Sequence, residues 1–252
     1  WAAEKGAFVD FLYLFPAAFL GWVVTAALLV RYVPDLDPNK EGDPEAAAKI
    51  EILKGGKVII AFGALTIALA VVGKQVLHLP PMWGMLFGLA ILQLYMYFLK
   101  TKHNVDVNIF EAMSKVENNT LLFFFGILAA VGALHFMGFL TYAAKLYEAF
   151  DPTIVNIGVG FLSAIVDNVP VMSAVLKANP AIDHAQWMLV TMTAGIGGSL
   201  ISFGSAAGVG VMGKMAGIYT FSSHIKLAWT VLVGYVVSVA VWYLQFIVLG
   251  FY

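Results

Sequence analysis

The chain has 252 residues, of which 61% are hydrophobic and only 12% are charged. Soluble domains carry about 25% charged residues, so this composition excludes a soluble globular domain and indicates that lipid is the solvent. The net charge of −1 provides no basic surface for nucleic acid. The absence of cysteine excludes disulfides, thiolate metal sites and cysteine nucleophiles.

Seven apolar segments approach or exceed the roughly 20 helical residues that cross a hydrocarbon core. In chain order they are residues 8–30, 58–77, 81–99, 120–140, 153–178, 187–217 and 227–249. The predicted fold is an all-α polytopic membrane protein. Polar residues between Arg31 and Lys57 predict the longest aqueous loop, with a short helix over 44–53, and the pattern over 106–119 predicts an interfacial helix. We expect two domains: residues 1–57, a first helix with a cytoplasmic linker, and residues 58–252, a transport domain.

The lysines and arginines indicate orientation only weakly. If residues 153–178 enter and leave on one side, ten of the 14 basic residues share one side of the membrane; if they cross, the split is nine to five. The positive-inside rule places the richer side in the cytoplasm in both cases. The expected location is a bacterial inner membrane or, alternatively, an organelle envelope.

The segment 153–178 carries one acidic residue, Asp167, near its centre. A charge at that depth costs about 2.5 to 3.5 kcal/mol on insertion scales, so it usually handles an ion or a proton; the alternative is a packing role. Pro170 cannot donate to the carbonyl of Val166, so one helix should stop near Val166. A second should start at Pro170, with Asn168 as its cap. We therefore predict a re-entrant hairpin over 153–178 with a non-helical tip over 163–171.

The segment 187–217 contains eight glycines, and as one helix it would measure about 46 Å. We predict a break between about Gly197 and Ser205, within side-chain reach of Asp167. Two interpretations stay open. Unwound backbone and hydroxyls can replace the water around Na⁺, whereas small residues can also let helices pack closely. The hydroxyls concerned are those of Ser199, Ser202 and Ser205.

Histidine offers one further candidate. The five histidines lie far apart in the sequence, which gives no metal-ligand cluster. His135 alone lies inside an apolar segment, residues 120–140, where it is either a satisfied packing residue or a pH sensor.

The sequence resembles the NhaD family of sodium/proton antiporters, within a wider ion-transporter superfamily. The resemblance rests on Ser163–Pro170, Thr193–Ser199 and Gly204–Gly208, with support from Pro80–Met85 and Leu121–Leu128. It implies an inverted-repeat transporter in which a re-entrant hairpin and a broken helix from each repeat meet at the ion site. It also implies an ion site formed by Ser163, Asp167, Asn168, Ser199 and Ser205, with Ser202 and Thr193 as weaker assignments.

The chain departs from the family pattern in one respect, because it has one hairpin motif and one glycine–serine break where the family carries a pair. We therefore expect the C-terminal half of a transporter. The expected partners are the lipid bilayer, the missing N-terminal half or a partner chain, and a second copy in a homodimer. No cofactor is expected.

The expected activity is exchange of Na⁺, or Li⁺, for H⁺ by competition at the Asp167 carboxylate. A sodium-coupled anion symporter of the same superfamily is the main alternative, although it would favour a neutral hairpin tip. An intramembrane aspartyl protease would need two facing aspartates, and a passive channel is the remaining alternative. The chain is not expected to be an enzyme.

Overall fold

The computed structural model describes residues 5–32, 55–103, 118–202, 204–205, 208, 211–212 and 219–250. Within these ranges the regular structure is helical and contains no strand, which confirms the all-α prediction. Four described helices are long and apolar enough to cross a membrane, or five if one bent pair forms a single span. The helices predicted over 44–53 and 106–119 lie outside the described residues.

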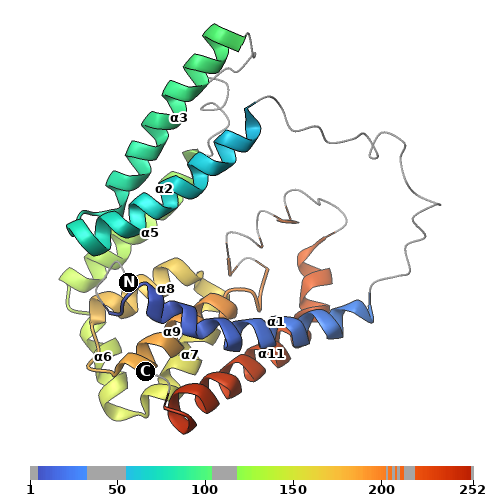
Figure 1. Cartoon of the computed structure of the whole chain (residues 1–252). Coiled ribbons are helices and arrows are strands. Elements are labelled where there is room, and N and C mark those ends of the chain that lie inside the picture. Colours follow the sequence, from blue (N-terminus) through green and yellow to red (C-terminus); the bar gives the residue numbers. More distant parts are fainter. Residues whose placement is uncertain are drawn as a thin grey trace. The chain divides into compact units, whose positions relative to one another are not determined.

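Two helices form a compact unit of their own, α2 (Gly56–Leu77) and α3 (Pro81–His103) (Figure 1). Their connection is tight because His78 adopts a left-handed conformation, with φ of 54°, and Leu79 N–H then donates to the Gly73 carbonyl. A Cβ on Gly84 would lie 2.4 Å from the Ala70 backbone nitrogen, so the helices touch at backbone distance. The two helices thus form a closely packed antiparallel pair.

The second compact unit contains α1 (Phe15–Val30), which lies along α11 (Phe221–Trp242) (Figure 1). Their contact uses small residues: a Cβ on Gly21 would lie 2.6 Å from the Gly234 carbonyl oxygen. Thr25 Oγ1 donates to the carbonyls of Gly21 and Thr230, at 2.9 and 3.3 Å. Both segments are less regular than predicted, because a 3-10 turn (Val9–Leu14) precedes α1 and a π-helical turn (Tyr243–Val248) ends α11.

The segment predicted as one span over 120–140 is instead bent. Helix α5 (Asn118–Phe136) is followed by α6 (Leu140–Ala149), with an angle of 71° between the two described parts. Gly138 has φ of 82°, which glycine adopts without steric cost, and Phe139 N–H donates to the Leu134 carbonyl. This left-handed glycine ends α5 and redirects the chain.

Three shorter helices complete this unit: α7 (Pro152–Val166), α8 (Asn168–Ala178) and α9 (His184–Gly197). Asp151 and Asp183 cap α7 and α9 by accepting from backbone N–H groups at 2.8 Å. Residues 185–190 of α9 are all buried, and all of them except Gln186 pack with Trp242 and Phe246 in the hydrophobic core. Helix α9 is therefore the central element of this unit, and α7, α8 and α11 pack against it.

Candidate functional site

The predicted helix break lies at Asp167. Helix α7 ends at Val166 and α8 begins at Asn168, so the non-helical tip is one residue rather than the predicted stretch over 163–171. Asp167, not Asn168, is the N-cap of α8: its Oδ1 accepts from Asn168 N–H at 2.8 Å. Pro170 lies in the first turn of α8, where a missing N–H breaks no helical hydrogen bond.

The backbone of Asp167 is strained. Its φ of 84° and ψ of 145° lie close to a region that is essentially restricted to glycine. Such a conformation costs about 1 to 3 kcal/mol for a residue with a side chain. Asp167 is also buried, with 6% of its surface exposed. Glycine would relieve the strain, so a carboxylate at this position indicates a requirement for its chemistry.

Helices α7 and α9 run in the same direction, as their contacts show. Asn156 pairs with Gln186 near the start of both helices, and Ser163 Oγ donates to the Ala194 carbonyl at 2.7 Å near their ends. A Cβ on Gly197, the last residue of α9, would lie 2.0 Å from the Gly160 carbonyl oxygen. Both helices therefore end on the same side of their contact.

This register fixes the direction of α8. From Asn156 to Asp167, α7 rises about 17 Å, and the chain must return to bring Gln186 beside Asn156. The eleven residues of α8 span about the same distance. Helices α7 and α8 thus form a hairpin with Asp167 at its tip.

The segment after α9 is the second predicted break, and its described residues between Gly198 and Ser205 are not helical. It contacts the hairpin tip: a Cβ on Gly204 would lie 2.3 Å from the Ala164 carbonyl oxygen, and one on Gly198 would lie 3.6 Å from Asn168 Cβ. We call residues 198–205 the break loop. Its contacts are with residues that flank Asp167 on both helices.

One predicted hydroxyl in this loop has unused hydrogen-bonding capacity. Ser202 is 1% exposed, and its Oγ has no hydrogen-bond partner among the described residues. A buried hydroxyl without a partner is costly, and in native proteins it usually has a functional explanation or a bound water or ion. Ser202 is the described residue in this loop that most directly indicates a ligand.

The other predicted residues differ in their surroundings. Ser163 and Thr193 are fully buried, and Thr193 Oγ1 donates to the Asn156 carbonyl at 2.9 Å, so both hydroxyls join α7 to α9. Ser199 is exposed, and Ser205 Oγ accepts at 3.1 Å from the N–H of Gly208, three residues beyond the loop. His135 is exposed in the last turn of α5, beside the bend.

Sequence reasoning missed a buried polar network at the start of α7 and α9. Asn156 Oδ1 accepts from the Tyr147 hydroxyl at 2.8 Å, and its Nδ2 donates to Gln186 Oε1 at 2.8 Å. Gln186 Nε2 in turn donates to Thr153 Oγ1 at 2.9 Å. Two amide side chains 30 residues apart give no local pattern; the available signal was Asn156, an amide within the otherwise apolar segment 153–178.

A second missed contact joins the break loop to the start of α11. His224 Nε2 lies 3.1 Å from the Ser199 carbonyl oxygen and 3.2 Å from that of Leu200, while its Nδ1 is hydrogen-bonded to the Tyr219 hydroxyl. Burial raises the pKa of Tyr219, which keeps the phenol protonated. At the opposite end of the hairpin, hydrogen bonds from the Thr153 hydroxyl and backbone N–H lower the pKa of Asp151.

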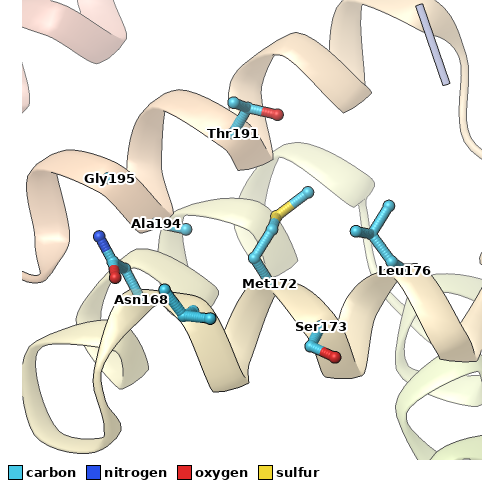
Figure 2. A pocket seen from close by; sticks show the side chains of 8 residues that line it. Asn168, Met172, Ser173, Leu176, Thr191, Ala194 and Gly195 are labelled. Atoms are coloured by element: carbon cyan, nitrogen blue, oxygen red, sulfur yellow. The ribbon is translucent and has the colours of Figure 1, made fainter. Parts of the chain in front are cut away.

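A pocket of about 410 Å³ opens beside the tip, between α8 and α9. Figure 2 shows Asn168 and Met172 of α8 extending toward α9, where Ala194 and Gly195 form the facing wall. The lining is mostly apolar, with Asn168, Ser173 and Thr191 as its polar members. The start of α8, immediately after Asp167, is therefore accessible from one side.

The charges at the tip favour a cation. Helices α7 and α9 both end here, and a helix C-terminus carries about −0.5 elementary charge, whereas the start of α8 contributes about +0.5. With an ionised Asp167 the site has a net charge of about −1.5, and with a protonated one about −0.5. Among the described residues there is no cluster of three His, Cys, Asp or Glu that could hold a metal ion.

A sequence model of the citrate transporter family matches residues 2–195, which are 194 of the 252 residues. The chain belongs to the citrate transporter family. Members and relatives named as transporters confirm that the chain is not an enzyme. The apolar helices and this membership together identify a multi-pass membrane protein.

The chain is also similar to named antiporters. The Na⁺/H⁺ antiporter NhaD of Alkalimonas amylolytica is 39% identical over 267 residues, covering 96% of the chain and 54% of the relative. NhaD of Vibrio parahaemolyticus is 39% identical over 261 residues, covering 93% and 62%. Sodium/proton antiporter 1 of Arabidopsis thaliana is 31% identical over 212 residues, covering 80% and 36%.

These similarities confirm the resemblance to NhaD antiporters. The chain spans about half the length of the curated relatives it matches. No solved structure matches the chain.

Proposed function

We propose that the protein containing this chain exchanges Na⁺ for H⁺ across a membrane, and that both ions compete for the Asp167 carboxylate. The observation that carries the proposal is a buried carboxylate, in a strained conformation, where two helix C-termini meet. The named relatives support the choice of ions, since two relatives that are 39% identical to the chain are named Na⁺/H⁺ antiporters.

Competition follows from the charge of the site. An ionised Asp167 gives it a net charge of about −1.5, which attracts a monovalent cation; a proton on the carboxylate removes most of that attraction. Exchange then needs no direct contact between the two ions. Each ion leaves when the other binds, because one carboxylate cannot hold both.

The remaining ligands would be neutral oxygens around the tip. We assign Asn168 and Ser163 from the hairpin and Ser202, Ser199 and Ser205 from the break loop, with Thr193 as a weaker assignment because its hydroxyl already donates to the Asn156 carbonyl. Ser202 is the strongest of these, because its buried hydroxyl has no other partner among the described residues. Hydroxyl and carbonyl oxygens suit Na⁺, and Li⁺ is a second candidate substrate because its charge and ligand preference are the same.

A sodium-coupled anion symporter is the second candidate, since the matching family is described as citrate transporter. The negative charge at the tip opposes it, because an anionic substrate would be repelled by the carboxylate and by two helix C-termini. Among the described helix ends at the tip, only the start of α8 offers positive charge.

The site requires more protein than this chain. We propose that the chain is the C-terminal half of an inverted-repeat transporter, that residues 58–252 form its transport domain, and that the missing half covers the open side of the tip. The pocket beside Asn168 supports this arrangement, since lipid would otherwise reach the site. We also propose that the protein lies in a bacterial inner membrane and forms a homodimer.

The test is Asp167→Asn in the complete transporter, assayed in inverted membrane vesicles with a pH-sensitive dye. Addition of NaCl should dissipate the proton gradient with wild type and leave it unchanged with the variant. Asn keeps the shape and one oxygen, so the amount of folded protein should be unchanged. Normal Na⁺-dependent proton movement in Asp167→Asn would contradict the proposal.

His135→Gln serves as the control in the same assay. His135 is exposed beside the α5–α6 bend, so its replacement should at most shift the pH at which exchange is half-maximal. Citrate and similar carboxylates are added in a parallel series. Sodium-dependent uptake of such an anion would favour the symporter.

A further inference from the structure

The break loop is attached to the rest of the unit through an imidazole. His224 lies in the first turn of α11, 25 residues after Ser199 of the loop, and is half-buried. Both of its ring nitrogens have partners: Nε2 faces the carbonyls of Ser199 and Leu200, and Nδ1 meets the Tyr219 hydroxyl. Each partner belongs to the connection between α9 and α11.

The partners determine which nitrogen carries the proton. Carbonyl oxygens only accept, so Nε2 must carry its hydrogen and donate to Ser199 and Leu200. In the neutral ring Nδ1 then accepts from Tyr219, whose phenol stays protonated because burial raises its pKa. Tyr219 therefore orients the ring, and the ring holds the loop.

The position of this contact connects it to the ion site. Ser199 and Leu200 lie three and two residues before Ser202, whose buried hydroxyl lacks a partner among the described residues. The loop rests on the hairpin tip two residues later, where Gly204 approaches the Ala164 carbonyl. The loop is thus held at one point by α7 and at another by α11.

We propose that His224 is a positioning residue for the cation site, and that Tyr219 fixes its tautomer and orientation. His224 itself does not touch the transported ion. It holds the backbone of the break loop so that Ser202 is directed toward the hairpin tip before the ion arrives. This inference rests on the proposed exchange function, and it adds a residue outside the hairpin and the loop.

The test compares His224→Phe, which keeps a ring but loses both nitrogens, with His224→Gln, which keeps an N–H donor. In the complete transporter, His224→Phe should raise the Na⁺ concentration for half-maximal exchange about fivefold to tenfold, the effect of losing one hydrogen bond. The maximal rate should stay within about twofold, because the ion-binding groups are all present. His224→Gln should restore most of the wild-type half-saturation concentration, since rescue requires only the donor.

Tyr219→Phe is the second variant, and it leaves His224 in place. Loss of the phenolic hydroxyl should raise the half-saturation concentration by about threefold, a smaller loss than removal of the donor itself. If His224→Phe fails to accumulate, the half-saturation concentrations of Tyr219→Phe and His224→Gln test the positioning role instead. Unchanged half-saturation in Tyr219→Phe, or equal values in His224→Phe and His224→Gln, would overturn the proposal.

Asp167→Asn and wild type are measured beside these variants. If wild type shows no Na⁺-dependent proton movement, the exchange function itself is wrong. If wild type is active, Asp167→Asn is inactive and His224→Phe has a wild-type half-saturation concentration, only the positioning role is wrong.

Discussion

The two ends of the α7–α9 contact differ in how their polar groups are used. At the start of the helices, Asn156 and Gln186 bond to each other and to Tyr147 and Thr153. At their ends, Asp167 is strained and Ser202 has no partner among the described residues. We call these the satisfied end and the open end.

This difference separates stability from function along one helix pair. A buried hydrogen bond that is complete contributes to stability, whereas a buried group without a partner costs about 1 to 3 kcal/mol. Strain at Asp167 adds a similar cost at the open end. The satisfied end thus supports the helices, and the open end retains groups that a cation can engage.

The largest expected effect on stability comes from separating α7 and α9 at Gly160, which lies between the satisfied end and the open end. A Cβ on Gly160 would lie 2.8 Å from the Thr193 carbonyl oxygen and 2.3 Å from the Tyr235 hydroxyl. Gly160→Ala should therefore separate α7 from α9 and cost about 3 kcal/mol. In a protein of this size the melting temperature would fall by about 6 to 12 °C, measured by thermal unfolding in detergent.

Gly158→Ala is the matched control on the same helix, because a Cβ there meets no atom within 4 Å. Alanine favours a helix over glycine by about 1 kcal/mol, so this variant should be equally or more stable than wild type. Equal melting temperatures for the two variants would show that α7 and α9 are not in backbone contact.

A smaller effect is expected at the satisfied end. Asn156→Leu keeps the volume but leaves Gln186 and the Tyr147 hydroxyl without their partner, which should cost about 2 to 3 kcal/mol. Tyr147→Phe removes only one donor and should cost about 1 kcal/mol. Thermal unfolding measures both, and the Na⁺ concentration for half-maximal exchange should stay unchanged. A large change in that concentration with normal stability would show that the satisfied end serves ion exchange and not stability.

The smallest effect on stability is expected at the open end. There, substitution should change the Na⁺ dependence of exchange and leave stability almost unchanged, the reverse of the satisfied end. Ser202→Ala removes a buried hydroxyl that has no described partner, so the melting temperature should stay equal or rise slightly. The half-saturation concentration for Na⁺ should rise about tenfold, because one ligand oxygen is lost. A destabilised variant with normal Na⁺ dependence would identify Ser202 as a packing residue.

Much of this arrangement could be predicted from single segments. A lone carboxylate followed by Pro170 was enough to locate the hairpin, and the glycines after Thr193 were enough to locate the break. The length of the tip was overestimated, because Pro170 is compatible with the first turn of a helix. The bend at Gly138 was missed because an isolated glycine in an apolar segment is compatible with a continuous helix.

Long-range pairs were not predictable. Asn156 and Gln186, or His224 and Ser199, meet only because α7, α9 and the start of α11 are brought together by packing. Single-sequence periodicity reports which face of a helix is apolar, and it contains no information on which distant residue a buried amide contacts. The satisfied end was therefore missed, whereas the open end was found through local signals.

The pairing of α1 with α11 has a consequence for synthesis. About 190 residues separate Val30 from Phe221, so at 5 to 20 residues per second α1 is made about 10 to 40 seconds before its partner. During that time the small-residue face around Gly21 has no α11 to pack against. The compact unit can close only when α11 emerges, which makes its last long helix the step that completes assembly.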